Sequence, residues 1–337
     1  MSTVYNAAWR NRADRSIARG SAISTTVLDP FPTHLSHGKG AFVYCADTGK
    51  RYIDFLSGLG TNLFGYGNEE IAKAVSQAYL TGSALSLSSS LEVECAELIQ
   101  LDMPWVKRSV FIQGEKSALR AAIEIAEAAT GKTPIVFGSG GHPPDEGLHI
   151  SSLQGLQKTC RETGTWLVMD ETMTGYRWPR LSLSRWAGIE PDLICLGGAM
   201  GGGMSLSAVC GRDAKGMNRH FYLYSAGDRT ALAAFKAVHQ MLKRPQWDLE
   251  DLQERGKLFI QNFNRLLEGV VSLEGCPTHA RLRGDQNSKV VFLQESRKAG
   301  LLFGSEFYFG FQHRELTEEV LGILKDIAMK IKLGGNL

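Results

Sequence analysis

Short apolar segments alternate with segments of helical periodicity along the middle of the chain, and this alternation constrains the fold more than any other feature. The expected strands are residues 109–112, 134–138, 165–170 and 192–196. The expected helices are residues 69–81, 91–101, 117–129 and 153–163. Strands that alternate with helices form a parallel sheet with helices on both faces. The sequence therefore predicts an α/β fold with a mostly parallel central sheet.

The length of 337 residues suggests two domains, at about 150 residues per domain. Residues 1–40 are expected to form an irregular N-terminal arm. Residues 41–235 are expected to form a large α/β domain, which opens with a hairpin of the runs AFVYCAD and RYIDFL around a TGK turn. Helices dominate after it, with a strand at 290–293, so residues 236–337 are expected to form a small α+β domain.

Composition and charge exclude several classes of protein. Hydrophobic residues make up 43% of the chain and charged residues 21%, which is typical of a globular protein and not of a disordered one. The 37 basic and 35 acidic residues give a net charge of +2, so charge does not indicate a nucleic-acid partner. The uncharged stretch 193–210 is rich in glycine, which makes it too flexible and polar for a membrane span.

The six cysteines are spread along the chain without a C-x-x-C pair, so they predict neither a zinc site nor a redox pair. They are expected to be buried, reduced thiols. The N-terminal stretch MSTVYNAAWRNRADRSIARG has no apolar core of the kind found in a signal peptide. These features together predict a cytoplasmic protein with no membrane partner.

Two carboxylates end the apolar run at residues 165–170, in the segment LVMDETMTG. In open α/β sheets, ligands bind beyond the carboxyl ends of the strands, so Asp170 and Glu171 are placed to hold a cationic or N–H group of a ligand. The same residues would also serve as a helix cap or an edge ion pair. The strand alone leaves both interpretations open.

Two glycine-containing turns are further candidates. The run GGAMGGG at residues 197–203 follows an apolar strand and allows close backbone approach to a ligand, although it also fits a structural turn. The run QGEKS at residues 113–117 lies between a strand and a helix, where free backbone N–H groups bind phosphate. Ser117 as a simple helix cap is the alternative. His142 follows another strand and could reach the same edge of the sheet.

Four segments resemble, in chain order, motifs of the class III aminotransferases of pyridoxal phosphate (PLP) fold type I, closest to the glutamate-1-semialdehyde aminomutase branch. They are GKGAFVYCADTGKRYIDFL, FIQGEKSALRAAIEIAEAATGK, WLVMDETMTGYR and PDLICLGGAMGGGMSLSAV. The resemblance implies a fold type I architecture, PLP as cofactor, an amino-acid or amine substrate and a homodimer. Relatives in biosynthetic and nucleic-acid-modification clusters imply a substrate joined to a larger carrier.

The resemblance also assigns roles to residues. It implies that Asp170 pairs with the pyridine nitrogen of the cofactor, which keeps the ring protonated as an electron sink. It places the phosphate on the turn that replaces the family's S-G-T-E-A motif. By position, the cofactor-binding residues are Gly114, Glu115, Lys116, Ser117, Asp170, Thr174, Gly198 and Ser225. Arg281 and Arg283 are candidates for binding a substrate carboxylate.

The chain departs from the family pattern at the most important position. Gly198 stands where the family has the lysine that forms a Schiff base with PLP, and glycine has no group that can do so. Glu115 in the phosphate turn would repel a phosphate, and Lys116 would attract it. The family segment that carries an aromatic ring stacked on the cofactor is missing after Gly131. An engineered replacement of the lysine would not account for these other changes.

Two functions remain open from the sequence. In the first, the chain is an aminotransferase- or aminomutase-like enzyme that binds PLP or pyridoxamine phosphate non-covalently, with Lys116 or His142 as the replacement base. In the second, the cofactor has been lost and the chain is a non-catalytic relative that serves as a binding or scaffold module.

Overall fold

The computed structural model describes residues 8–18, 33–138, 150–212, 217 and 228–333. The chain divides into two compact units. We call residues 60–63 and 69–254 the sheet unit, because they contain the central sheet. We call residues 1–59, 64–68 and 255–337 the terminal unit, because they contain both ends of the chain.

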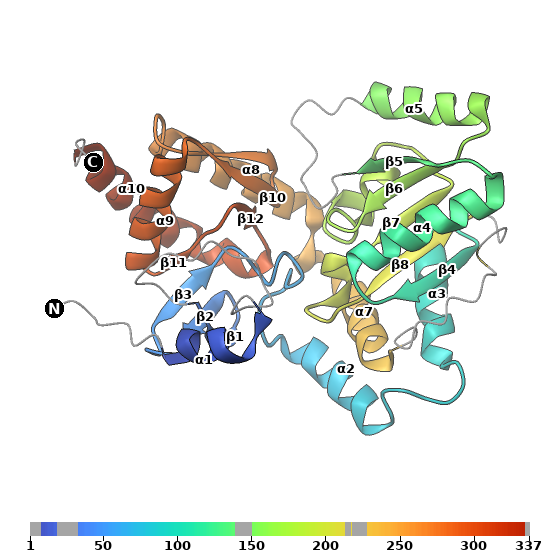
Figure 1. Cartoon of the computed structure of the whole chain (residues 1–337), viewed down its shortest axis with the longest axis horizontal. Coiled ribbons are helices and arrows are strands. Elements are labelled where there is room, and N and C mark those ends of the chain that lie inside the picture. The colour runs from blue at the N-terminus through green and yellow to red at the C-terminus, as the bar shows by residue number, and fades with distance from the viewer. Residues whose placement is uncertain (1–7, 19–32, 139–149, 213–216, 218–227, 334–337) are drawn as a thin grey trace. The chain divides into compact units, whose positions relative to one another are not determined.

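The sheet unit contains five strands in the order β4-β8-β7-β6-β5 (Figure 1). They are β4 (Arg108–Ile112), β5 (Ile135–Gly138), β6 (Leu167–Glu171), β7 (Leu193–Leu196) and β8 (Ser207–Gly211). Strands β5, β6 and β7 run parallel, but β8 is antiparallel to both β7 and β4. The sheet is therefore mixed, and the prediction of a mostly parallel sheet was too simple, because β7 and β8 are joined by the glycine turn and not by a crossover helix.

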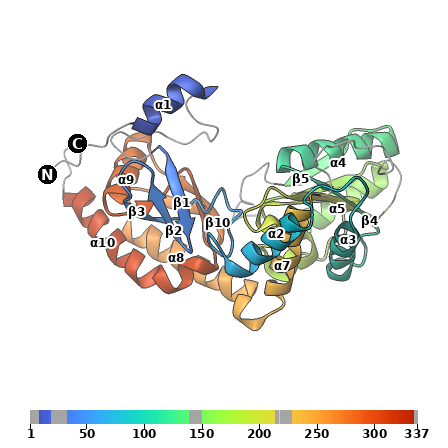
Figure 2. The same ribbon diagram turned by 90° about the horizontal axis from the view of Figure 1, so that it is seen from below.

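Helices cover this sheet. They are α2 (Glu69–Leu80), α3 (Ser90–Asp102), α4 (Glu115–Thr130), α5 (Ile150–Thr163), the short α6 (Leu183–Trp186) and α7 (Arg229–Leu242). Helix α4 packs across β6, β7 and β8. Its buried stripe is mostly alanine, as at Ala118, Ala122 and Ala126, which brings the helix close to Val168 and Cys195 of the sheet. Helix α7 packs against α2 and α3, and Figure 2 shows α4 and α7 on different sides of the sheet.

The terminal unit has two small sheets. The first has the order β1-β2-β3-β11, from β1 (Leu35–Lys39), β2 (Phe42–Cys45), β3 (Arg51–Asp54) and β11 (Leu301–Leu302). The second has the order β12-β10-β9, from β9 (Ser272–Cys276), β10 (His279–Arg283) and β12 (Glu306–Tyr308). Its helices are α1 (Ala8–Ser16), α9 (Gln286–Lys298), α10 (Thr317–Leu333) and the end of α8 (Leu249–Leu266).

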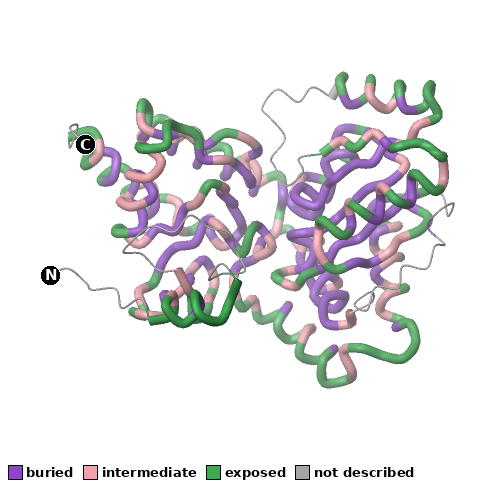
Figure 3. Tube along the Cα trace, in the orientation of Figure 1, coloured by how far each residue is buried: buried purple, intermediate pink, exposed green. Residues whose placement is uncertain are grey.

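Phenylalanines form the core of the terminal unit. The ring of Phe55, which follows β3, stacks on Phe303 with centroids 4.7 Å apart and on Phe259 and Phe307 at 5.4 Å. In both units, the buried residues lie mainly on the strands and on the helix faces that pack against them (Figure 3). This aromatic cluster explains why the N-terminal hairpin belongs with the C-terminal segments.

Several expectations are confirmed and others were wrong. The β2–β3 hairpin and the helices and strands expected between residues 69 and 196 are present, with small shifts of their ends. The arm 1–40 is not entirely irregular, because it contains α1 and β1. Residues 290–293 lie in the helix α9 and not in a strand, since Asp285 caps a helix there by accepting a hydrogen bond from the Ser288 N–H at 3.0 Å.

The compact units also differ from the expected division at residues 40 and 235. Residues 41–59 lie in the terminal unit because β3 pairs with β11 in a parallel ladder, Ile53 facing Leu301. The sheet unit extends past residue 235 to residue 254. Helix α7 belongs to it because it packs against α2 and α3.

All six cysteines are free and buried. Within the described part of the chain, no helix combines the length and the apolar character needed to cross a membrane.

Candidate active site

Asp170 lies at the carboxyl end of β6, in the centre of the parallel part of the sheet. Its Oδ1 atom accepts hydrogen bonds from the N–H of Thr172 at 3.2 Å and from the hydroxyl of Thr172 at 2.7 Å. The residue is 6% exposed, and its Oδ2 atom has no hydrogen-bond partner among the described residues. A buried carboxylate with one oxygen left over is suited to receive an N–H group from a ligand.

Glu171, the next residue, is engaged entirely by protein groups. It accepts hydrogen bonds from the N–H of Leu183 at 2.6 Å and of Ser184 at 2.7 Å, and from the hydroxyls of Ser182 at 3.0 Å and Thr174 at 3.3 Å. Burial raises the pKa of Glu171, although these hydrogen bonds oppose the shift. The carboxylate therefore holds the start of α6, which is the capping interpretation, and it also occupies the hydroxyl of Thr174 that was expected to bind the cofactor.

Gly198 begins a short 3-10 turn, Gly198–Gly201, after β7. Its φ angle is +53°, a left-handed conformation that glycine adopts readily and other residues adopt at a cost. A Cβ atom on residue 198 would stand 2.7 Å from the carbonyl oxygen of Thr172. The backbone is therefore built for glycine here, and a lysine would not fit without a change in the turn.

Glu115 projects toward the same turn. Gly114, with φ at +84°, stands as the N-cap of α4, so the helix begins at Glu115 and Ser117 is not its cap. The Glu115 Cγ atom lies 3.2 Å from the place of a Cβ on Gly197, and its Oε1 atom lies 3.4 Å from that of a Cβ on Gly198. Part of the space that a side chain at residue 198 would fill is thus taken by a carboxylate.

Charges of both signs act on Glu115. Burial raises the pKa of Glu115, the nearby charge of Asp170 raises it further, and Arg177 lowers it. Arg177 is itself buried and donates a hydrogen bond to the carbonyl of Gly60. Two carboxylates therefore influence one another at the edge of the sheet.

Ser207, the first residue of β8, contributes an unsatisfied polar atom. Its hydroxyl is fully buried and has no hydrogen-bond partner in the part of the chain that the structure describes, and it lies 2.9 Å from the place of a Cβ on Gly197. The sequence analysis did not identify Ser207 or Arg177. For Arg177, its place in the TGYR motif was a usable signal, but nothing in the sequence distinguished Ser207 from other serines.

The structure places the remaining candidates as follows. Lys116 and Ser117 are exposed on the first turn of α4, next to Glu115 but directed to solvent. Arg281 and Arg283 lie on β10 of the terminal unit and pair with Glu306 at 3.0 Å and Glu274 at 3.4 Å. These two guanidinium groups are already engaged. His142 and Ser225 lie outside the described residues.

The comparison with known families decides the relationship. A family model named "Aminotransferase class-III" matches residues 134–307, about half of the chain. The chain belongs to this family.

Curated relatives agree with this assignment. The chain is 27% identical over 248 residues to the glutamate-1-semialdehyde 2,1-aminomutase of Symbiobacterium thermophilum, a match that spans 54% of the chain and 57% of that enzyme. The same enzyme of Bordetella avium is 26% identical over 330 residues, covering 74% of the chain and 76% of the enzyme. The match thus spans little more than half of the first relative.

Solved structures show the same fold. The PLP internal aldimine form of the Sphingopyxis FumI protein superposes with a TM-score of 0.85 at 19% identity, covering 98% of this chain and 97% of that one. The β-phenylalanine aminotransferase of Variovorax paradoxus superposes with a TM-score of 0.84 at 21% identity, covering 98% and 95%. The prediction of fold type I is confirmed.

PLP has a pyridine nitrogen, an aldehyde and a phosphate, and the described residues fit only the first. The free Oδ2 atom of Asp170 is a suitable acceptor for the protonated ring nitrogen. Residue 198 has no side chain that could react with the aldehyde. The N-terminus of α4, where a phosphate would bind, carries the carboxylate of Glu115. PLP would therefore have no covalent anchor at residue 198, and its phosphate would meet a carboxylate in place of a favourable partner.

Proposed function

We propose that the chain is an aminotransferase- or aminomutase-like protein that acts on an amino acid or an amine without a lysine at position 198. The observation that carries this proposal is the state of Asp170, which is buried, held in place by Thr172 and left with one oxygen free. Because Oδ2 has no hydrogen-bond partner among the described residues, it is available to accept an N–H group of a ligand.

The absence of a reactive side chain at residue 198 implies that any cofactor is held non-covalently, in the pyridoxal or the pyridoxamine form. A base that replaces the lysine must come from elsewhere, and Lys116 and His142 remain the candidates. Lys116 follows Glu115 on the first turn of α4, so a rotation of its flexible side chain would be required before it could act at the site.

A non-catalytic binding or scaffold module is the second candidate function. Gly198 and Glu115 favour it, because a left-handed turn closed to side chains and a carboxylate at the helix N-terminus both disfavour the family's usual cofactor. In this function, Asp170 would bind the N–H group of an amine ligand that is not converted.

A homodimer is part of the proposal. Large apolar side chains are exposed on α2, on α3 and on the loop between them, at Tyr79, Leu80, Leu85, Leu87 and Val93. Large exposed apolar side chains grouped along one segment of the chain are often covered in a protein interface. A second copy of the chain is the partner we expect, because the surface lies in the same unit as the site.

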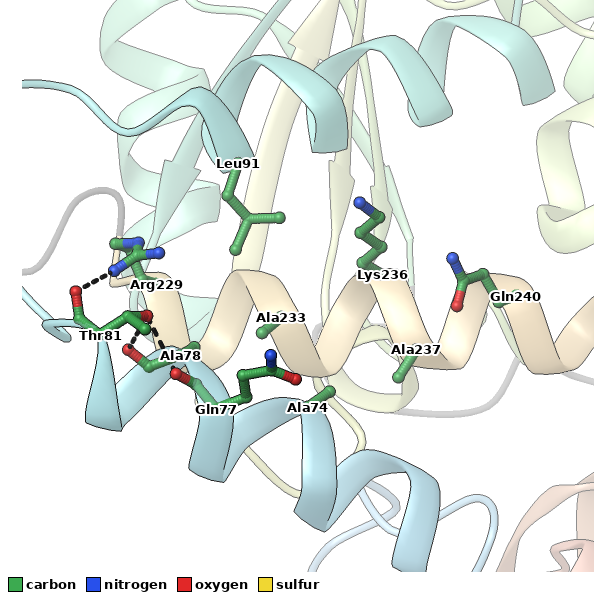
Figure 4. Close-up of a pocket in the computed structure, with 10 residues that line it drawn as sticks. All are labelled: Ala74, Gln77, Ala78, Thr81, Leu91, Arg229, Ala233, Lys236, Ala237 and Gln240. Carbon is green, nitrogen blue, oxygen red and sulfur yellow. Dashed lines mark hydrogen bonds between the residues drawn. The ribbon is translucent and has the colours of Figure 1, made fainter.

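A groove of about 360 Å³ lies between α2, α3 and α7 (Figure 4). Its floor is formed by small side chains of α2 and α7, and polar or charged side chains line the rest: Ala74, Ala78, Ala233, Ala237 and Leu91, with Gln77, Thr81, Arg229, Lys236 and Gln240. The small side chains leave room for a side chain from a second copy. The groove therefore supports the homodimer proposal.

An amino acid or amine carried by a larger molecule fits the family relationship, and the six buried free thiols agree with a reducing, cytoplasmic location.

The proposed function is tested by a visible absorption spectrum of the purified protein titrated with PLP, followed by borohydride reduction and peptide mapping. We expect saturable binding without a reduced adduct on the protein, and loss of that binding in the Asp170→Asn variant. An adduct on Lys116 would instead show a relocated Schiff base. Absence of binding to any pyridoxal or pyridoxamine form would contradict the enzyme proposal and favour the non-catalytic candidate.

A further inference from the structure

The site has the wrong charge for a phosphate. The N-terminus of α4 begins at Glu115 after Gly114, whose φ is +84°, and no side chain caps it. Such a helix end attracts an anion through its free N–H groups and its dipole. Here the first residue of the helix supplies the anion itself, since Glu115 is acidic and, among the described residues, interacts with Arg177 only through charge and not through a hydrogen bond.

The position of Glu115 also favours a positive group beside residue 198. Its Oε1 atom lies 3.4 Å from the place of a Cβ on Gly198, which is the side of the site where the family's lysine would begin. Asp170 presents its free Oδ2 atom at the end of β6. Two carboxylates thus face one site, and the buried, unpartnered hydroxyl of Ser207 lies on the Gly197 side of the same turn.

We propose, resting on the function proposed above, that this site takes an unphosphorylated, cationic heteroaromatic amine in place of a phosphorylated cofactor. Asp170 accepts a hydrogen bond from the protonated ring nitrogen, and Glu115 pairs with an ammonium group on the residue 198 side. Pyridoxamine has both groups and no phosphate, so it is the probe for this class of ligand. Pyridoxamine phosphate differs only by the phosphate and is the matched comparison.

Charge repulsion is the physical reason for the selectivity. A phosphate dianion on the α4 N-terminus would lie within a few ångströms of the Glu115 carboxylate, in a partly buried place where such interactions are weakly screened. An ammonium group beside Glu115 is attracted by Glu115 and Asp170, and this attraction outweighs the repulsion from the single guanidinium of Arg177, which is engaged with the carbonyl of Gly60. The two ligands therefore respond in opposite directions to the charge at residue 115.

The test is the ratio of two dissociation constants, for pyridoxamine and for pyridoxamine phosphate, measured by isothermal titration calorimetry on the full chain. The wild-type protein is expected to bind pyridoxamine roughly tenfold more tightly than pyridoxamine phosphate. Glu115→Gln is expected to reverse or abolish this preference. Glu127→Gln, which removes the same charge from the exposed end of α4, is the matched control and should leave the ratio unchanged.

The ratio is informative even if a variant is partly misfolded, because both ligands are measured on the same sample. Tighter binding of pyridoxamine phosphate by the wild-type protein, or an unchanged ratio in Glu115→Gln, would overturn this inference. If the wild-type protein bound pyridoxamine phosphate more tightly, and the Asp170→Asn variant lost this binding, the proposed function would stand but the inference on ligand charge would be overturned. Binding of neither ligand would contradict both.

Discussion

The carbonyl oxygen of Thr172 lies 2.7 Å from the point where a Cβ atom of residue 198 would stand, so the turn after β7 is shaped for Gly198. We predict that Gly198→Ala lowers the free energy of unfolding by about 3 kcal/mol, the sum of a left-handed backbone penalty and a steric one. The measurement is urea unfolding followed by circular dichroism. Gly198→Lys is expected to be at least as unstable and to give no borohydride-reduced adduct with PLP at residue 198.

Gly188 provides the control for this prediction. Its φ angle is +70°, similar to that of Gly198, but a Cβ there would have no atom within 4 Å. Gly188→Ala should therefore lose only the backbone penalty, about 1 kcal/mol. Equal losses at the two positions would show that the turn relaxes around a side chain at residue 198.

Asp170 and Glu171 are adjacent acids, and we predict that replacing Glu171 lowers stability whereas replacing Asp170 lowers ligand binding. Glu171→Gln should lower the free energy of unfolding by on the order of 3 kcal/mol. The N–H groups of Leu183 and Ser184 donate to the two different oxygens of Glu171, and glutamine replaces one of these oxygens with an NH2 group that cannot accept. Asp170→Asn retains an oxygen for Thr172 and should change stability by less than about 1 kcal/mol. Thermal and urea unfolding of both variants measure the difference.

Ligand binding gives the complementary measurement. Asp170→Asn should abolish binding of pyridoxamine or PLP while the protein stays folded. A stable Glu171→Gln variant, or a strongly destabilised Asp170→Asn variant, would contradict the assignment of a structural role to Glu171 and a ligand-binding role to Asp170.

The stability of the terminal unit is expected to depend on pH through Asp54, which accepts a hydrogen bond from Tyr66. Burial raises the pKa of Asp54 from 3.8 to about 6, and hydrogen bonds from Tyr66 and Leu56 limit the rise. Because the folded protein holds this proton more tightly than the unfolded chain, the contribution of Asp54 to stability falls as pH rises from about 4 to about 6. The loss is on the order of 3 kcal/mol over that window.

The measurement is urea unfolding at several pH values in the wild-type protein and in Asp54→Asn. The difference in stability between the two should fall with rising pH and level off above about pH 6, since only the wild-type protein carries the titrating group. Tyr66→Phe removes a hydrogen bond that lowers the pKa, so it should shift the window to higher pH. Parallel curves for all three proteins would exclude Asp54 as the source.

The elements that the sequence predicted correctly are those encoded by neighbouring residues. The hairpin follows from the alternation around Gly49, and α4 follows from the alanine stripe that fits it to the sheet. Asp170 was found because a strand that ends in a carboxylate marks the ligand edge of an α/β sheet. These features are local, so a single sequence is enough to identify them.

The features that were missed depend on contacts between distant segments. The run at residues 290–293 is apolar and β-branched, but its placement in α9 is decided by the cap at Asp285 and by the side that Phe292 buries. The direction of β8 is decided by its pairing with β4 and β7. Likewise, the sequence placed Glu115 in a phosphate turn but could not show that its carboxylate reaches Gly198.

The exposed apolar surface on α2 and α3 leads to the last prediction. Leu80 and Leu87 are 84% and 85% exposed, and we expect a second copy to cover them. The double variant Leu80→Glu, Leu87→Glu should shift the protein from dimer to monomer in sedimentation velocity, because each glutamate would have to lose its water in the interface. Leu258→Glu, at a leucine of α8 that is 57% exposed, is the control and should leave the dimer intact. A wild-type protein that sediments as a monomer at all concentrations would contradict the homodimer proposal.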